Sequence, residues 1–571
     1  MTEPQSEPIG ANAHRKPTPS GRRIAGLLLL LPAVLAWFAY QVLPVLRTLW
    51  LSLLESGLEG DGALVGLENY GRLPGTFFSG ALVQLLLGLL IASMAVTVGI
   101  LLGMLLRRAP IGWQRIAFAI VALGLVTYAP LNLAYALYWG YGEPLGARLL
   151  LAMLPVPLMI GLLTAALARS GRLLLVIGAV TALGGAAWAL QDEVSILVAN
   201  PAESPTAFIY RSTFSMVDVG TGAAASTVIG AVLGALGFGA GLMLLAIRPR
   251  FDLTRSARGG AAMPGAYPMS GPGTSAGSSG HGLLAVVAAG VVLVGLVVLA
   301  LPWLPHLGST VEGLDSASAA RATWSTVGRR ALDLILTLLV TGAAALGLGY
   351  LRPFGKHSVR ALLVVSPWLF VGLIPLMTGL YLRFGGLQEY SGAPFFGITA
   401  QMLAVPLLFL LTYLADGMRT ARDAGARVPV GSVVGVTVLG IGIVALVRSQ
   451  EVVWDIVFLY DQANSALQMV FQVLSMHFGQ TIPLGLVTPV VLLVLGALVL
   501  AGAAALVPGV RLVPAEELAR QHAELRQSGP WQHQYGHAEH GQAEYGRAEY
   551  GYLPERQSDH PQPGTWTDPH R

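Results

Sequence analysis

The sequence predicts an all-α, polytopic membrane protein of about twelve transmembrane helices, built as two six-helix halves with both termini in the cytoplasm. Composition, the spacing of apolar segments and the placement of arginines lead to this fold class. Of the 571 residues, 54% are hydrophobic and only 11% are charged, whereas soluble domains carry roughly 25% charged residues. Because an apolar excess of this size exceeds what a soluble core can bury, we expect a lipid bilayer as the solvent.

Twelve apolar segments approach the length of about 20 residues that a helix needs to cross a bilayer. The first of them follows Arg22 and Arg23 and is too long for a signal peptide, so we expect an uncleaved first helix. The expected spans cover residues 24–51, 81–106, 114–138, 148–168, 173–190 and 222–247, and then 283–304, 330–351, 360–382, 395–415, 430–448 and 484–507.

The charged residues between these segments predict the orientation. Cytoplasmic loops of membrane proteins carry an excess of lysine and arginine, and alternate loops of this chain follow that rule when the N-terminus lies inside. The expected inside loops hold Arg107, Arg108, Arg248, Arg250, Arg352, Lys356, Arg360, Arg419 and Arg422, and the expected outside loops hold Glu55, Glu59, Asp61, Glu68, Asp192, Glu193, Glu312 and Asp315. With arginine far commoner than lysine, the composition favours a bacterial cell membrane.

Composition also divides the chain into five regions. We expect a disordered cytoplasmic N-tail over 1–21, a first half over 22–250, a Gly/Ser/Pro-rich cytoplasmic linker over 251–281, a second half over 282–510 and a disordered cytoplasmic C-tail over 511–571. The tail contains His522, His533, His537 and His540. Because a low-complexity tail fixes no ligand geometry, we predict no metal site there.

The two halves share an order of local features that indicates duplication. The segment GMLLRRAPIGWQR ends at Arg115 and GYLRPFGKHSVR ends at Arg360, and each arginine precedes a proline at the same distance, Pro130 and Pro375. Later, WALQDEVSILV in the first half corresponds to VRSQEVVWDIV in the second. Six helices per half make the repeats parallel, so a solute path is expected between them.

Two segments of the first half resemble a known family. The first reads LLLLLPAVLAWFAYQVLPVLRTLWLSLLE, with Leu43-Pro44 and Ser52, and is followed by the box VGLENY at Val65 to Tyr70. There, Gly66 is expected to free the backbone for a turn and Tyr70 to lie at the membrane interface. The second segment carries Tyr210, Phe214, Asp218, Gly220 and Ala224 in order.

Residues 24–510 thus resemble two fused permeases of carbohydrate-type, binding-protein-dependent ABC importers, of the maltose and glycerol-phosphate kind. The resemblance implies import of a sugar or similar polar solute. It also implies cytoplasmic ATPase subunits and an extracytoplasmic solute-binding protein as partners.

Permeases of this family dock on the ATPase through a Glu-Ala-Ala…Gly loop that forms a short helix. In the first half that position holds only Arg169 to Arg172, which is too short for two helical turns. In the second half Thr420 to Ala426 resembles a shortened form of the loop. Its candidate coupling residues are Arg419, Arg422, Asp423 and Gly425; the alternative is an ordinary basic loop.

Polar residues inside expected spans are candidates for the solute path, because burying them in lipid is costly and they usually face the interior. Tyr128, Asn132 and Tyr135 share one helical face, and aromatic rings beside an amide suit a sugar; Gln84 lies in the preceding span. The alternative is interhelical hydrogen bonding together with an interfacial aromatic belt.

Carboxylates near span ends are further candidates. Asp192, Glu193 and the repeat-related Glu451 are expected at the outer mouth, where they either contact a binding protein or are simply solvated. Asp333 is expected to pair with Arg329 or Arg330, its neighbours one turn away.

No GxxxxGK[ST] loop and no HExxH motif occurs, so we predict no catalytic residue, no cofactor and no enzyme activity in this chain. We expect no nucleic-acid partner. Two alternatives to import remain open. One is a permease-derived scaffold or regulator that no longer couples to an ATPase, favoured by the missing first coupling loop. The other is an ion-coupled secondary transporter, against which the scarcity of mid-membrane carboxylates speaks.

Overall fold

The computed structural model is largely helical and contains long apolar helices. Seven helices are long and apolar enough to cross a membrane, or eight if one bent pair is a single span, among the residues that the structure describes. The chain is therefore a multi-pass membrane protein; twelve spans and the orientation stay predictions. The structure describes residues 19–56, 62–128, 153–168, 170–193, 196, 204–253, 279–301, 304–308, 315–384, 403–449, 453–458, 465–470 and 484–517.

Every span expected in the first half overlaps a helix. The first is a continuous rod of α1 (Pro19–Trp37), the π-helix η1 (Phe38–Val42) and α2 (Leu43–Leu51). The remaining helices are the short α3 (Glu68–Gly71), then α4 (Gly75–Leu106), α5 (Ile111–Leu125), α8 (Pro155–Leu167), α9 (Gly171–Leu190), α11 (Pro205–Tyr210), the π-helix η2 (Arg211–Ser215) and α12 (Val219–Ile247).

The second half follows the same order, with more breaks. It contains α13 (Ser279–Ala300), η4 (Leu304–Leu307), α14 (Ser316–Ala345) with the π-helix η5 (Leu346–Leu351), η6 (Gly355–His357), η7 (Val359–Ala361), α15 (Leu362–Val365), η8 (Ser366–Leu369), η9 (Ile374–Leu376) and α16 (Met377–Phe384). Then follow α18 (Val405–Asp423), α19 (Val430–Arg448), the π-helix η12 (Trp454–Phe458), α21 (Leu484–Val487) and α22 (Val490–Leu506).

The third expected span of the second half is bent rather than straight. Its two parts, Gly355–Leu369 and Ile374–Tyr381, meet at 81°. Pro367 and Pro375 lie at the starts of η8 and η9, and a proline removes a backbone donor and cannot continue a regular helix. The bend leaves the connecting residues 370–373 facing the first half, where they become part of the site described below.

Two antiparallel ribbons interrupt the helical architecture, although the sequence predicted no strands. One joins β1 (Leu54–Ser56) to β2 (Gly62–Leu64), and the other joins β3 (Pro249–Asp252) to β4 (Arg511–Pro514). The strand β3 directly follows α12 and β4 closely follows α22, so the ribbon ties together the ends of the last helix of each half. Its residues extend into the ranges expected for the linker and the C-tail.

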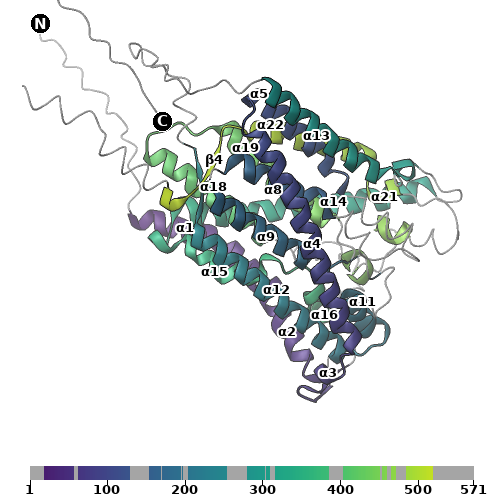
Figure 1. Cartoon of the computed structure of the whole chain (residues 1–571). Helices are drawn as coiled ribbons and strands as arrows, with labels where there is room; N and C mark the ends of the chain where they lie inside the picture. The colour runs from purple at the N-terminus through teal and green to yellow at the C-terminus, as the bar shows by residue number, and fades with distance from the viewer. Residues whose placement is uncertain are drawn as a thin grey trace, which may run out of the picture. The chain divides into compact units, whose positions relative to one another are not determined.

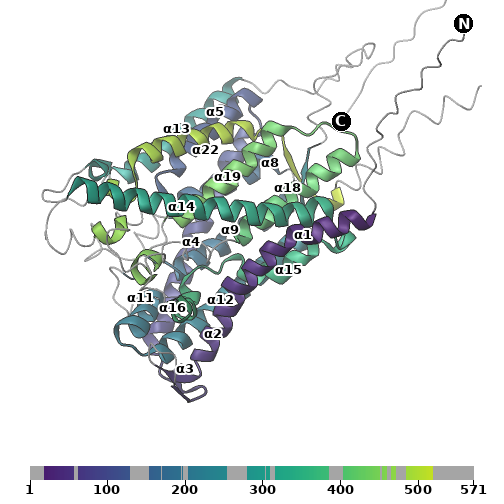
Figure 2. The ribbon, with the colours of Figure 1, turned by 180° about the vertical axis from the view of Figure 1, so that it is seen from behind.

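The halves contact each other reciprocally (Figures 1 and 2). The first helix of each half packs on the second and third helices of the other: α1 and α2 on α14 and α16, and α13 on α4 and α5. The last helix of each half packs on the third of the other, α12 on η8 and α22 on α5. Corresponding helices of the two halves thus exchange the same contacts. Such an exchange is characteristic of an isologous interface, which has two-fold symmetry.

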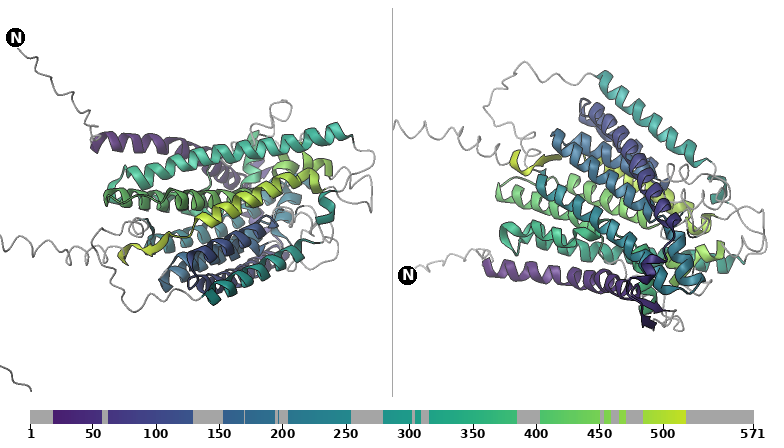
Figure 3. Two further views of the ribbon diagram at one scale, coloured as in Figure 1. Left: turned by 90° about the horizontal axis from the view of Figure 1, so that it is seen from above. Right: turned by 60° about the horizontal axis from the view of Figure 1, so that its bottom comes forward.

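Within the first half, small residues let three helices approach closely. A Cβ added at Gly99 of α4 would collide with the carbonyl oxygen of Leu158 in α8, and one at Gly88 would lie 2.8 Å from the carbonyl oxygen of Gly185 in α9. Close backbone approach of this kind drives helix association in lipid, where apolar burial supplies little driving force. The helices of the bundle run in roughly similar directions in Figure 3.

Candidate functional site: a cavity between the halves

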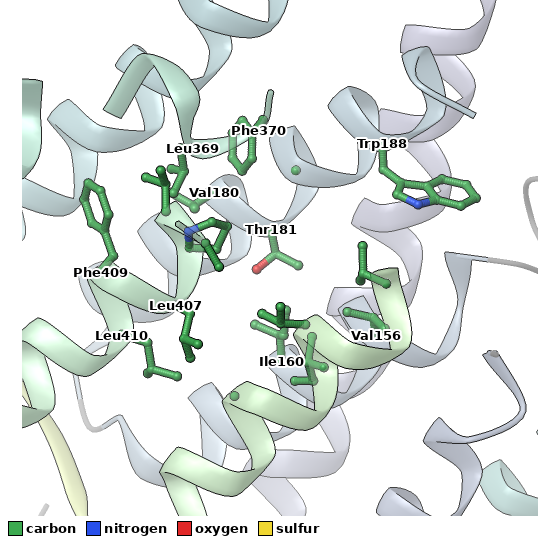
Figure 4. Close-up of a pocket in the computed structure, with 18 of the residues that line it drawn as sticks. Val156, Ile160, Val180, Thr181, Trp188, Leu369, Phe370, Leu407, Phe409 and Leu410 are labelled. Carbon is green, nitrogen blue, oxygen red and sulfur yellow. The ribbon is translucent and has the colours of Figure 1, made fainter. Parts of the chain in front are cut away.

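A cavity of about 610 Å³ lies between the two halves, within the size range of small-molecule sites. Its walls include α8 and α9 on one side and α18 and α19 on the other (Figure 4), the helices in the fourth and fifth expected spans of each half. The sequence of each helix explains its position, because the lining residues recur every three or four positions and form one face. In α9 they are Ile177, Val180, Thr181, Gly184, Gly185 and Trp188.

The walls are mainly apolar. Val156 and Ile160 of α8 face the same space as Leu407 and Leu410 of α18 in Figure 4, while Trp188 and Phe370 close one side. Charged lining residues are few and lie at helix ends. A sugar, which needs a polar partner for each hydroxyl, is poorly matched to such walls.

At one end of the cavity, here called the basic end, the β3–β4 ribbon forms the floor. Pro249, Phe251 and Leu512 of the ribbon line the cavity. Asp416 of α18 lies beside them, 2% exposed, and pairs with Arg250 of β3 at 3.2 Å and with Arg352 after η5. This ion pair joins the end of the first half to the second.

The opposite end, here called the acidic end, is closed by polar bonds across the halves. The Gln191 side chain donates to the carbonyl oxygen of Phe370 at 2.7 Å and accepts from the Gly372 amide at 2.6 Å. Glu193 accepts a hydrogen bond from the Val453 amide at 3.0 Å. The expected mouth residues Asp192 and Glu193 therefore lie where the halves meet, Asp192 being buried.

Glu451, the third residue expected at the mouth, lies outside the described residues. Its neighbour Val453 nevertheless contacts Glu193, so the repeat-related segments come together at this end of the cavity.

A partly buried arginine at the acidic end, Arg448, corrects one expectation. Asp333 does not pair with Arg329 or Arg330; it accepts from Arg448 of α19 at 2.6 Å. Arg448 also donates to Thr337 at 2.6 Å and lines the cavity. Both expected partners bind Asp455 of η12 instead, because this distant carboxylate is buried between them.

The residues expected in the solute path have three different outcomes. Tyr128 lines the cavity and is 2% exposed, and its ring centroid lies 6.3 Å from that of Trp188, with the rings tilted by 56°. Gln84 does not line the cavity: it is fully buried on the face of α4 that packs within the first half. Asn132 and Tyr135 lie outside the described residues, so their place in the path stays a prediction.

The expected coupling residues form the end of a long helix. Arg419 and Arg422 donate to the backbone oxygen and the hydroxyl of Tyr350, respectively. Asp423 is the last residue of α18, and Gly425, with φ of +65°, stops the helix: its amide and that of Ala426 bond back to Arg422 and Ala421. Residues 424–429 form no separate helix.

Outside the cavity, the two segments that carry the family resemblance contact each other. Ser52 and Tyr70 share a hydrogen bond of 2.7 Å, and Asn69 donates to the backbone oxygens of Ser52 and Leu54. Gly66 has φ of +63°, which confirms the turn. A Cβ on Gly220 would lie 2.7 Å from the Asn69 amide, so the box and the last loop of the first half form one packed unit.

Sequence reasoning missed several lining residues, among them Gln41, Tyr413 and Arg448. Gln41 lies inside an expected span, as Gln84 does, so the criterion that selected Gln84 also applies to it. The same criterion applies to Tyr413, which lies inside the expected span 395–415. Arg448 is the last residue of its expected span, and the packing of distant helices brings it to the cavity.

No group of three or more His, Asp or Glu side chains suited to a metal occurs in the part of the chain that the structure describes. Comparisons with protein-family models, curated proteins and solved structures found no match for this chain.

Proposed function

We propose that this chain is a membrane transport protein whose solute path runs between its two halves. The main support for the proposal is the composition of the cavity wall, to which the helices of the fourth and fifth expected spans of each half contribute. Parallel repeats that share a path across their interface are a recurring design of transporters. On this proposal the basic end faces the cytoplasm, in agreement with the arginine distribution.

Cysteine accessibility tests this path directly, because the natural chain contains no cysteine. Val180→Cys and Thr181→Cys place single thiols on the cavity face of α9, and Leu175→Cys places one on its 72% exposed opposite side. We expect a membrane-impermeant thiosulfonate to label the two cavity positions in proteoliposomes. Leu175→Cys should stay unlabelled, because a thiol in lipid does not ionise.

Failure of both cavity positions to react from either side of the membrane would contradict the path. Equal labelling of Leu175→Cys would show instead that α9 is not embedded as described.

A second candidate, ATP-driven import through a separate ATPase, is favoured by the exposed end of α18. Arg422, Asp423 and Arg427 are exposed, and the family resemblance gives this segment the coupling role. We expect the combined Arg422→Ala, Asp423→Ala and Arg427→Ala variant to lose ATP hydrolysis that co-purifies with the chain in mild detergent. Asp416 is left intact because it holds the ion pairs at the cavity floor.

The matched control changes Arg107 and Arg108, which are equally exposed and basic, and should keep that activity. Absence of co-purifying hydrolysis from the unmodified chain would reject ATP coupling and leave the solute path untouched.

A further inference from the structure

Two residues that line the cavity each carry a polar atom with no hydrogen-bond partner among the described residues. They are Oε1 of Gln41 and the hydroxyl of Tyr413, and each atom is itself buried. Both residues line the cavity and are more than nine-tenths buried, with 8% and 5% of their surface exposed. An unpartnered buried polar atom costs free energy, so each is a point where a bound molecule gains by offering a hydrogen bond.

These two points are separated along the cavity. Gln41 is fixed by a bond from its amide nitrogen to the backbone oxygen of Leu403, 3.2 Å away. Leu403 lies two residues before the first residue of α18, and Tyr413 lies within α18, ten residues after Leu403. At a rise of 1.5 Å per residue, this is a separation of about 15 Å along the helix.

Between the two points the walls offer little to a polar molecule. Leu407 and Leu410 of α18 face the cavity there, opposite Ile160 and Val180 of the first half. Thr181 bonds its hydroxyl to the backbone oxygen of Ile177 at 2.8 Å, so its donor is already used. A molecule with many hydroxyls would leave several of them without partners, at a cost for each one.

We infer that the cavity binds an elongated, uncharged and largely apolar molecule with a hydrogen-bonding group near each end. Gln41 accepts a hydrogen bond from one end and Tyr413 exchanges one with the other. This inference rests on the proposed function for the role of the cavity, and it replaces the polar solute that the family resemblance implied.

The probe is 1,12-dodecanediol carrying a mid-chain diazirine, added to the purified full chain in detergent, activated by light and mapped by peptide mass spectrometry. We expect saturable labelling on the cavity faces of α9 and α18. Unlabelled 1,12-dodecanediol should compete, 1-dodecanol should compete more weakly because it lacks one hydroxyl, and maltose should not compete at the same concentration.

Two variants test the named contacts. Gln41→Leu and Tyr413→Phe should each raise the half-saturating probe concentration about fivefold, the effect of one net hydrogen bond. Tyr210→Phe is the matched control, since Tyr210 does not line the cavity, and should leave it unchanged. Thermal unfolding of each variant separates lost binding from lost folding.

Competition by maltose, unsaturable labelling of lipid-facing helices, or unchanged saturation in both variants would overturn the inference. These outcomes are separable from failure of the proposed function. If the thiol of Val180→Cys is labelled but the diol does not bind, the solute path is supported and this ligand is rejected. If the diol binds but the thiols do not react, the binding site is supported and the solute path is rejected.

Discussion

The second helix of each half occupies the same place in the predicted repeat, but the two helices are held by partly different forces. In the first half, Gly88 and Gly99 of α4 lie against the backbones of α9 and α8. In the second half, Gly328 and Gly342 of α14 have no neighbouring atoms within 4 Å of an added Cβ. There, Arg329 and Arg330 bind Asp455, and Asp333 binds Arg448. The same span continues into η5, where a Cβ added at Gly349 would collide with the carbonyl oxygen of Thr412 in α18. Close packing therefore occurs in both halves, and the second half adds partly buried ion pairs.

This difference bears on the cavity. Close packing fixes α8 and α9 against α4 through many weak contacts, which form and break together. An ion pair between helices is one strong contact whose loss frees a charge in a low-dielectric setting. The position of Arg448 at the end of α19 therefore depends on one identifiable pair, whereas α18 also packs closely on Gly349.

The largest expected effect is the loss of an ion pair in the second half. Asp455 is 1% exposed between Arg329 and Arg330, so Asp455→Asn leaves both arginines without a carboxylate. Breaking a buried pair costs roughly 3–5 kcal/mol. Thermal unfolding followed by tryptophan fluorescence should show a clear loss of stability.

The control for that experiment is Asp423→Asn, which removes an exposed carboxylate 3.5 Å from Arg419. Surface pairs contribute about 0–1 kcal/mol, so its unfolding temperature should hardly change. Equal effects of the two substitutions would contradict the claim that buried charge holds the second half.

A smaller effect is expected from one methyl group in the first half. Gly99→Ala forces a Cβ against the backbone of α8, and overpacking of this kind costs roughly 1–3 kcal/mol. Gly342→Ala is the matched change in α14; it meets open space and removes the helix penalty of glycine. We expect the first substitution to lower the unfolding temperature and the second to raise it slightly. The reverse order would refute the packing contrast.

Gln84 provides a test in the opposite direction. Both atoms of its side-chain amide are buried without a partner among the described residues, and it lies on the packed face of α4. Gln84→Leu should raise stability by about 1 kcal/mol, because it removes an unsatisfied polar group. It should leave the labelling of Val180→Cys unchanged. Destabilisation together with altered labelling would return Gln84 to the solute path, as the sequence suggested.

The smallest expected effect is a pH dependence at the start of α14. Asp315 caps this helix, and hydrogen bonds from Ser318 and Ala317 hold the pKa of its carboxyl below the usual range. A lowered pKa means that the stabilisation is present above the ordinary aspartate pKa and is lost as the pH falls through the folded value. Amide exchange over residues 315–323, corrected for intrinsic rates, should therefore increase at pH about 3 relative to pH 6. Asp315→Asn should remove this difference; if it persists, another group is responsible.

Much of the helical framework follows from the sequence, because apolar segment length and helical period are local properties. All twelve expected segments overlap helices, and Asp218 begins α12 as a cap whose carboxylate accepts from the Thr221 amide. The turn at Gly66 was likewise readable, since a φ of +63° favours glycine.

Long-range partners were not predictable from the sequence. A local rule assigned Asp333 to Arg329 or Arg330, but the structure pairs it with Arg448, which is 115 residues away. The β3–β4 ribbon joins segments more than 250 residues apart. Such contacts depend on how helices distant in the sequence pack together, and no residue spacing within either partner encodes that.

The reciprocal contact of the two halves is the central claim, and two engineered disulfides test it. A Cβ added to Gly230 of α12 would lie 3.4 Å from the Cβ of Pro375, and a Cβ added to Gly496 of α22 would lie 4.0 Å from Cγ1 of Val126. The first distance suits Cβ atoms joined by a disulfide, and the second, measured to Cγ1, places the Val126 side chain beside α22. Each pair joins the last helix of one half to the third span of the other.

The measurement uses a protease site placed in residues 254–278 and a non-reducing gel after cleavage. We predict that Gly230→Cys with Pro375→Cys, and separately Gly496→Cys with Val126→Cys, each hold the two fragments together. Gly234→Cys with Pro375→Cys should not, since Gly234 has no atom within 4 Å of an added Cβ. A cross-link in only one of the two reciprocal pairs, or in neither, would contradict the shared interface on which the cavity depends.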